Sequence, residues 1–285
     1  MSYEIREVSV EEFPPLLREI PQPPKQLYYR GILPAPDRQL LSVVGSRHYT
    51  TYGAQVVTHI LEGLRGYNIG IVSGMAIGID GLAHEAALNA GLYTLAIPGS
   101  GLGDSVLYPA RHKRLARRIL ESGGGLLSEY DATQVATNWS FPQRNRLVTG
   151  ISRATLLIEA GEKSGTLITA KLCVDYNRDL MIVPGSIFSK NSLGVHQFLK
   201  LGATPVTNPA DIISYFNLEP QLTTQDMSSL SNQEQQIISL LATPLCLDEI
   251  VRQVPFETAQ VVSLIMHMEL KGLLIESQGY YRAVI

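Results

Sequence analysis

The sequence predicts an α/β fold in which a large, mainly parallel β-sheet is followed by a small C-terminal domain. Between residues 40 and 206, short apolar runs alternate with amphipathic stretches, the pattern of a parallel sheet covered by helices on both faces. A polar run then separates this region from a second unit with helical apolar spacing. A length of 285 residues is sufficient for one large domain and one small one.

The expected strands are short, apolar and bounded by turn residues. They are residues 41–44, 69–73, 93–97, 126–128, 155–158 and 180–183, with a seventh if 204–206 joins the sheet. The expected helices between them include 52–64, 80–89 and 166–176. Right-handed crossovers would place the turns that follow these strands along one edge. We therefore predict an extended Rossmann-like parallel sheet.

The chain divides into four predicted segments. Residues 1–38 are rich in proline and predict an extended approach segment with a short amphipathic turn at 16–20. Residues 39–220 form the Rossmann-like domain, and the polar residues 221–229 fit a linker. Residues 230–285 predict a winged helix, because three helical patterns precede a hairpin pattern. The helices are expected at 233–241, 247–251 and 257–270, and the hairpin strands at 273–277 and 280–283.

The composition is that of an ordinary folded protein, with 45% hydrophobic and 17% charged residues. The net charge is −3, so nucleic-acid binding would require a local concentration of basic groups. Cys173 and Cys246 lie far apart without metal-binding spacing, so neither a zinc site nor a disulfide framework is predicted. Neither an apolar leader nor a run of transmembrane length occurs. We expect a cytoplasmic protein that does not associate with membranes.

Two glycine-rich turns follow the first two expected strands. Gly45-Ser46-Arg47 combines a glycine that lets a phosphate approach the backbone with two side chains that can donate hydrogen bonds to it. Residues 73–80 contain Gly74 and Gly78, a density that fits a backbone nest for an anion or a close base contact. Turns at strand ends are where α/β sheets bind anions. The candidate ligands are Gly45, Ser46, Arg47, Gly74 and Met75, although an exposed arginine on a tight turn is the alternative for Arg47.

A third candidate stretch is Phe141-Pro142-Gln143-Arg144-Asn145-Arg146. Ser140 is expected to cap a helix that begins near Phe141, with Gln143 completing a capping box. Arg144 and Arg146 would then lie about 200° apart, so both cannot face one ligand and one can brace the loop from behind. Phe141 either stacks on an unpaired base, worth roughly 1–3 kcal/mol, or forms a hydrophobic staple. The candidates from this stretch are Phe141, Arg144, Asn145 and Arg146.

Two further stretches could contact phosphates. Ser164-Gly165-Thr166 precedes a helix, so its amides and hydroxyls can hold an anion with Lys163 beside them, and a simple N-cap is the alternative. Residues 111–118 form the densest basic run. They either contact a polyanion directly or form a solvated helix face that steers one. The candidates are Lys163, Ser164, Gly165 and Thr166, with Arg111, Lys113 and Arg114 as weaker ones.

The sequence predicts no cofactor, metal ion or catalytic group. Residues 99–104 miss the dinucleotide motif, because Asp104 stands where its third glycine belongs. Asp80 and His84 are four residues apart and could pair. However, a position near a helix start favours an aspartate for capping and dipole reasons alone, so we expect structural roles for both.

The C-terminal unit is acidic. Residues 225–285 contain seven acidic and three basic residues, and 257–270 contains no lysine or arginine. A recognition helix of this kind would gain little from phosphates. We therefore expect the module to serve protein contacts or regulation.

Together these blocks resemble the DNA-processing protein A family, called DprA or Smf. The resemblance runs from about Phe13 to the C-terminus, and the order and number of the blocks make it specific. The blocks are Val43-Val44-Gly45-Ser46-Arg47, Ser73-Gly74-Met75-Ala76 with Gly78-Ile79-Asp80, Tyr108-Pro109, Ser128-Glu129, Phe141-Pro142 with Arg144-Asn145-Arg146, Glu159-Ala160, Ser164-Gly165-Thr166-Leu167 with Thr169-Ala170, Pro184-Gly185 and Gly202-Ala203. Many members carry a small helical domain before this region, for which residues 1–38 leave no room.

The resemblance implies a single-stranded DNA-binding protein of natural transformation and recombination. Members of the family bind and protect incoming single strands, load the recombinase RecA onto them, help to displace single-strand-binding protein and act as dimers or larger assemblies. A self-association face is one interpretation of residues 194–201, where Val195, Phe198 and Leu199 share a helical spacing. Core packing explains these three residues equally well.

A nucleotide-binding sensor or an enzyme is the alternative. Phosphoribohydrolases of the same superfamily share a P-G-G-x-G-T-x-x-E block that supplies a catalytic glutamate, and the nearest match here has Thr169 in that place. Glu129 and Glu159 remain possible acids, but no base, nucleophile or metal cluster accompanies them. We therefore do not expect an enzyme.

Overall fold

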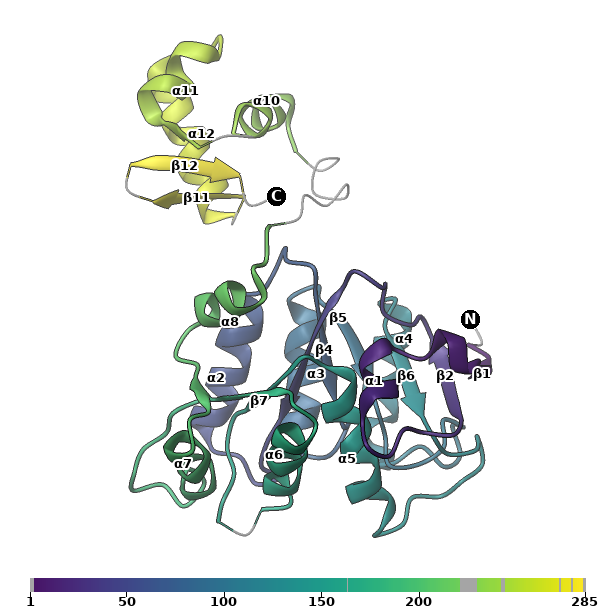
Figure 1. Cartoon of the computed structure of the whole chain (residues 1–285). Helices are drawn as coiled ribbons and strands as arrows, with labels where there is room; N and C mark the ends of the chain where they lie inside the picture. The colour runs from purple at the N-terminus through teal and green to yellow at the C-terminus, as the bar shows by residue number, and fades with distance from the viewer. Residues whose placement is uncertain are drawn as a thin grey trace. The chain divides into compact units, whose positions relative to one another are not determined.

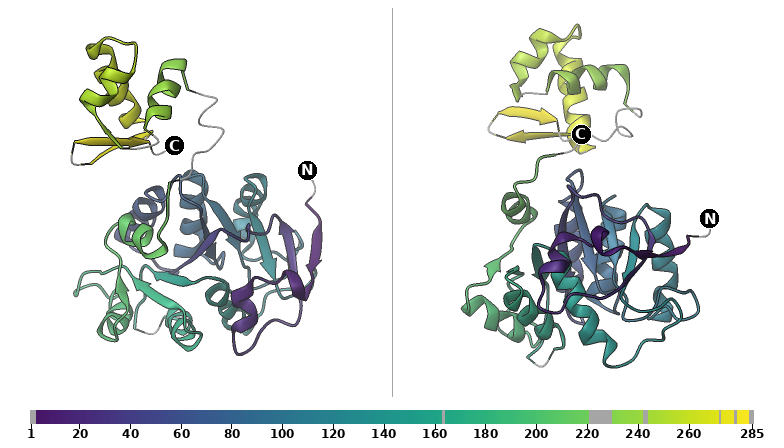
Figure 2. Two further views of the ribbon diagram at one scale, coloured as in Figure 1. Left: turned by 45° about the horizontal axis from the view of Figure 1, so that its top comes forward. Right: turned by 45° about the vertical axis from the view of Figure 1, so that its right-hand side comes forward.

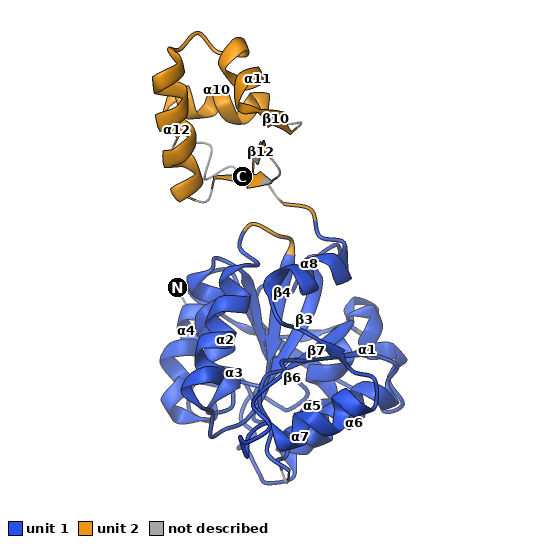
Figure 3. Ribbon diagram, turned by 90° about the vertical axis from the view of Figure 1, so that its left-hand side faces the viewer, with its two compact units in different colours: residues 1–65, 69–218 blue, residues 66–68, 219–285 orange. Residues whose placement is uncertain are grey.

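The computed structural model describes residues 3–162, 164–220, 230–241, 244–271, 273–277 and 279–283. The chain forms two compact units, residues 1–65 with 69–218 and residues 66–68 with 219–285, which Figure 3 colours separately. Each unit has its own cluster of buried apolar side chains. The predicted linker, residues 221–229, lies outside the described residues.

The first unit is built on a nine-stranded sheet with the order β1-β2-β6-β5-β4-β3-β7-β8-β9 (Figure 1). The seven strands from β6 to β9 are parallel, which confirms the predicted Rossmann-like sheet. They are β3 (Gln39–Val44), β4 (Ile69–Ser73), β5 (Tyr93–Ala96), β6 (Gly125–Ser128), β7 (Ala154–Leu157), β8 (Asp179–Ile182) and β9 (Thr204–Pro205). Residues 204–205 therefore provide the seventh strand, beside β8.

The N-terminal segment, predicted as an extended approach segment, also adds two strands to the sheet. Strands β1 (Ile5–Val8) and β2 (Leu27–Gly31) pair antiparallel with each other, and β2 pairs antiparallel with β6. Between them lie the 3₁₀-helix η1 (Val10–Glu12) and the short helix α1 (Pro15–Glu19). The prolines of this segment all fall outside β1 and β2, as expected because proline cannot donate a ladder hydrogen bond.

Helices cover both faces of the sheet (Figures 1, 2 and 3). Those of one face are α2 (Thr51–Glu62), α3 (Ile79–Asn89), α4 (Lys113–Glu121) and α8 (Pro209–Phe216); those of the other are α1, α5 (Ser140–Ile151), α6 (Thr166–Asp175) and α7 (Leu193–Lys200). The chain runs from β3 outward in one direction and from β7 outward in the other. The carboxyl ends of β3 and β7 therefore form the switch point, where open α/β sheets bind ligands.

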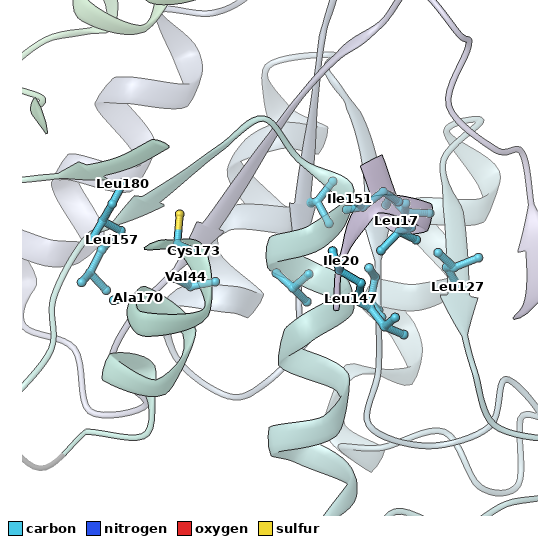
Figure 4. Close-up of a cluster of buried hydrophobic side chains, with 14 of the residues drawn as sticks. Leu17, Ile20, Val44, Leu127, Leu147, Ile151, Leu157, Ala170, Cys173 and Leu180 are labelled. Carbon is cyan, nitrogen blue, oxygen red and sulfur yellow. The ribbon is translucent and has the colours of Figure 1, made fainter. Parts of the chain in front are cut away.

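The core beneath α5 joins the N-terminal segment to the sheet. Leu17 and Ile20 lie beside Leu147 and Ile151 of α5, and Leu127 of β6 completes this part of the cluster (Figure 4). All five side chains are buried. Full burial of such a side chain contributes about 1.5–3 kcal/mol, so this packing fixes α5 against the sheet.

The second unit is the predicted winged helix. Its elements are α10 (Asn232–Leu240), β10 (Leu245–Cys246), α11 (Leu247–Gln253), α12 (Thr258–Leu270), β11 (Leu274–Ser277) and β12 (Tyr280–Ala283). The hairpin of β11 and β12 is confirmed, and β10 adds a third strand that is too short for a periodic signal. The buried Glu234 accepts the Ser231 amide in a capping box and a hydrogen bond of 2.8 Å from Lys271 Nζ. No helix in the described part of either unit is long and apolar enough to cross a membrane.

Candidate nucleic-acid interface

The turns after β3 and β7 and the first turn of α5 surround a cleft of about 600 Å³. It lies at the switch point between β3 and β7, as the strand order requires. The predicted ligands that line it are Gly45, Ser46, Arg47, Phe141, Arg144, Asn145, Ser164, Gly165 and Thr166. The topology therefore brings together residues from three distant parts of the sequence.

The turns after β3 and β4 pack against each other and hold Arg47 at the rim. The Ile79 amide donates a hydrogen bond of 3.2 Å to the Ser46 carbonyl oxygen. Gly78 has a φ of +98°, and a Cβ there would lie 2.4 Å from the same oxygen. A Cβ on Gly45 would lie 2.7 Å from Ile79. Glycines at both positions thus let the two turns form one platform, from which the exposed Arg47 projects.

Phe141 lies between Arg47 and Tyr108 at the edge of the cleft. The guanidinium carbon of Arg47 is 5.5 Å from the centroid of the Phe141 ring, a cation–π contact. The Tyr108 ring centroid is also 5.5 Å away, at an interplanar angle of 48°. Tyr108 is 48% exposed and Phe141 is half-buried, so an aromatic surface remains open beside the arginine.

The capping box predicted for the start of α5 is wrong, and the staple alternative for Phe141 is not formed. The helix begins at Ser140 with Trp139 as its N-cap residue and without a side-chain capping bond, so there is no Ser140/Gln143 capping box. Instead, the Ser140 hydroxyl lies 2.6 Å from the Gly99 carbonyl oxygen and accepts the Thr137 amide at 3.0 Å. Phe141 lies inside the helix, whereas a hydrophobic staple precedes the N-cap.

Arg144 forms the buried floor of the cleft and is only 3% exposed. Its guanidinium donates to the carbonyl oxygens of Gly74 and Ile97. A Cβ on Gly74 would lie 2.5 Å from both Arg144 Nη1 and Asp80 Oδ2, so the absence of a side chain there makes room for both charges. Burial raises the pKa of Asp80 and lowers the pKa of Arg144, while the attraction between the two groups opposes both shifts.

Arg146 points away from the cleft, as the helical spacing of the two arginines predicts. It forms an ion pair with Glu129 and donates a 2.6 Å hydrogen bond to the Gln22 carbonyl oxygen. Burial raises the pKa of Glu129, and the neighbouring Arg146 opposes this shift. Arg146 therefore ties α5 to β6 and the N-terminal segment and does not line the cleft.

The turn after β7 also lines the cleft and is bonded to the turn after β3. The Thr166 hydroxyl donates a 3.0 Å hydrogen bond to the Gly45 carbonyl oxygen, and the Ser164 hydroxyl lies 2.9 Å from that of Thr166. Among the described residues other than its chain neighbours, no atom lies within 4 Å of the position a Cβ would occupy on Gly165. The start of α6 thus offers hydroxyls and an open backbone to a bound anion. Lys163 lies outside the described residues.

The other predicted residues lie next to the cleft or beyond it. Gly74 lines a smaller recess beside Arg47, Tyr108 and Phe141. The Met75 side chain is buried in the core, and its backbone oxygen lies 2.8 Å from Nδ1 of His112. The weaker candidates are on the 3₁₀-helix η2 (Ala110–His112) and on α4, outside the cleft; they are Arg111, Lys113 and Arg114.

Glu159 and His84 both make structural hydrogen bonds. Glu159 accepts hydrogen bonds from the Thr50 amide at 2.9 Å and the Thr50 hydroxyl at 2.6 Å, and so holds the start of α2. His84 Nδ1 lies 2.7 Å from the Thr94 hydroxyl, and burial lowers the pKa of His84 to about 3. No group of three potential metal ligands occurs among the described residues.

Several residues that line the cleft carry no signal in the sequence. They are His48, Asn138 and Asn191. Asn191 donates a 2.7 Å hydrogen bond to the His48 carbonyl oxygen and so links the loop after β8 to the turn after β3. Single polar residues in loops become recognisable as cleft residues only when the topology is known.

The comparisons with known proteins agree with this architecture. Residues 5–217 match the model of the family described as "DNA recombination-mediator protein A", and residues 221–279 match the DprA winged helix domain. Protein Smf of Escherichia coli K12 is 34% identical over 283 residues, which cover 95% of this chain and 75% of that protein. The DNA processing protein DprA of Streptococcus pneumoniae R6 is 38% identical over 70% of each chain.

Two solved structures share the fold of about three quarters of the chain. The X-ray structure of DprA from Streptococcus pneumoniae superposes with a TM-score of 0.69 at 35% identity, covering 77% of this chain and 76% of that one. A Helicobacter pylori DprA structure, described as giving insight into its single-stranded DNA binding mode, has a TM-score of 0.68 at 27% identity, covering 75% and 96%. The chain therefore belongs to the DNA recombination-mediator protein A family, known as DprA or Smf, and carries the winged helix domain of that family.

Proposed function

We propose that the protein binds single-stranded DNA in the cleft at the switch point. The observation that carries this proposal is the convergence of Arg47, Phe141 and the Ser164-Gly165-Thr166 turn on one 600 Å³ cleft. Arg47 and the hydroxyls and amides of the turns would hold successive phosphates. An unpaired base would stack on the surface of Phe141 and Tyr108, which accepts any base because every base has a π-face.

The biological role that we propose is the handling of single strands in natural transformation and recombination. A strand gripped by its phosphates keeps its base edges free for pairing, as a recombinase requires. This supports the protection of incoming DNA and the loading of RecA onto it, with displacement of single-strand-binding protein, in the cytoplasm. The function that we propose is binding without turnover, and the structural bonds of Glu159 and Glu129 support it.

We also propose that the protein self-associates through the apolar surface around α7. Val195 and Phe198, which the sequence left open as contact residues, are buried in the core. The exposed apolar residues here include Ile187, Phe188, Leu193 and Leu201, and Phe188 is 92% exposed. A second copy is the occupant that we propose for this surface. In sedimentation velocity, Phe188→Asp should convert a dimer to a monomer, and a wild-type monomer at all concentrations would contradict the proposal.

The experiment that tests strand binding is fluorescence anisotropy with a labelled single strand at several salt concentrations. We expect log K to fall with log salt by about 0.7 for each phosphate contacted. Arg47→Ala should bind more weakly and with a shallower slope. Arg18→Ala, which removes an equally exposed charge from α1, is the matched control. Tight binding of a free nucleotide without salt-dependent strand binding would favour the nucleotide-sensor or enzyme alternative.

A further inference from the structure

The helix α4 and the preceding η2 present the most basic surface of the first unit. Leu115, Ala116, Ile119 and Leu120 form the buried face of α4. The basic residues on the opposite side are Arg111, Lys113, Arg114, Arg117 and Arg118, and all five are exposed. None of them takes part in an ion pair among the described residues. The cleft uses none of these charges.

The five charges form two rows with different surroundings. Lys113 and Arg117 face Asp104, whose pKa is lowered by the hydrogen bond from Arg30 and by the charges of Arg30, Arg117 and Lys113. Arg30 approaches this carboxylate to 2.5 Å. The Asp104 carboxylate therefore already balances part of the positive charge of Lys113 and Arg117.

The second row consists of Arg111 on η2 and of Arg114 and Arg118, which are four residues apart and therefore share one face of α4. Arg118 reaches Asn89 Oδ1 at 3.5 Å, a neutral contact. The positive charge of this row is therefore not balanced by an ion pair. At about 1.5 Å per residue the row extends over roughly 10 Å, enough for two or three phosphates of a single strand.

The row begins close to the open aromatic surface of the cleft. Tyr108, which contacts Phe141, is followed after Pro109 by η2. His112 Nδ1 lies 2.8 Å from the Met75 carbonyl oxygen, so the end of η2 is attached to the turn after β4. That turn also belongs to the platform that holds Arg47. The cleft and the arginine row are thus connected through fixed backbone.

We propose that a single strand bound in the cleft continues across Tyr108 and along α4, with its phosphates on Arg111, Arg114 and Arg118. This inference rests on the proposed strand binding in the cleft. It divides the binding surface into a cleft segment, which grips both phosphates and bases, and a helix segment, which contacts phosphates alone. The helix segment would add affinity only for strands long enough to reach it.

The test compares short and long strands in fluorescence anisotropy, using oligothymidylates of about 5 and about 20 nucleotides. In the variant R111Q/R114Q/R118Q, binding of the long strand should weaken at least about tenfold at moderate salt. The slope of log K against log salt should fall by about 2 for three lost phosphate contacts. Binding of the short strand should stay within about twofold, because the cleft is unchanged.

Two further variants make the result specific. The variant R18Q/K25Q/K171Q removes three exposed charges elsewhere on the same unit and should leave both strands bound as in the wild type. Arg47→Ala should weaken both strands, because it alters the cleft. The inference is overturned if R111Q/R114Q/R118Q affects both strands equally, affects neither, or matches R18Q/K25Q/K171Q. If wild-type protein binds neither strand, the proposed function itself fails.

Discussion

Arg144 shows how one almost fully buried cation can organise the turns that surround a cleft. Its guanidinium joins the ends of β4 and β5 through the carbonyl oxygens of Gly74 and Ile97. It also compensates the buried carboxylate of Asp80, which in turn accepts the Ala76 amide at 3.3 Å. Arg144 therefore supports the turns that surround the cleft, whereas Arg47 is an exposed cation among its described residues.

Arg144→Met should destabilise the first unit by about 3–5 kcal/mol, because it leaves the Asp80 carboxylate buried without its partner. Two carbonyl oxygens would also lose their donor. Urea unfolding monitored by circular dichroism measures the loss. In the double variant Asp80→Asn/Arg144→Met, part of the stability should return, since the unpaired charge is gone. If the stability loss of the double variant equals the sum of the losses of the two single variants, the two groups are not coupled.

His84 predicts a pH dependence of stability. Burial lowers its pKa from 6.5 to about 3 in the folded state, so between these values the unfolded chain binds a proton that the folded chain does not. The contribution of His84 to the free energy of unfolding should therefore fall as the pH drops below about 6.5, by up to about 1.4 kcal/mol per pH unit.

The matched variant for this prediction is His84→Gln, which cannot titrate. The difference in unfolding free energy between wild type and variant should shift against the wild type as the pH is lowered from 7 toward about 4.5. Parallel pH profiles of the two proteins would show that His84 does not control this dependence.

At the scale of elements, the site depends on how closely two turns approach each other. Gly78→Ala would place a Cβ 2.4 Å from the Ser46 carbonyl oxygen at a φ of +98°. We expect a loss of about 1–3 kcal/mol in stability and weaker strand binding, because the Arg47 turn must move. Gly91→Ala is the control, since its φ is +70° but its surroundings are open. Its stability should fall by roughly 1 kcal/mol with unchanged strand affinity in anisotropy.

Elements whose residues form a local pattern can be predicted from the sequence, whereas features that depend on distant residues cannot. β4 and β7 are buried at every position and are recognised from a continuous apolar run. β1 and β2 pair at the edge of the sheet with mixed polar and apolar side chains, and nearby prolines mask their pattern. The 3.6-residue period of a helix predicts that Arg144 and Arg146 point in different directions from α5. The burial of Arg144 depends on carbonyl groups 70 and 47 residues away in sequence, which no local pattern encodes.

At the scale of the whole molecule, the two units differ in chemistry as well as in fold. The exposed cations of the cleft and of α4 belong to the first unit. The second unit carries the acidic excess, and α12 contains neither lysine nor arginine. Exposed side chains on α12 include Met266, at 62%, and Leu270, at 87%. Such a helix suits a protein partner better than a phosphate backbone.

A chain that ends at residue 220 should therefore bind single strands as well as the full protein does. The first unit has its own buried core, so it should fold without the second unit. In anisotropy, the affinity should stay within about twofold and the salt slope unchanged, because no phosphate contact is lost. If the affinity instead falls tenfold and the salt slope becomes shallower, the winged helix contacts the strand. Tighter binding would instead mean that the acidic unit competes with the strand, since removing negative charge strengthens the attraction for phosphates.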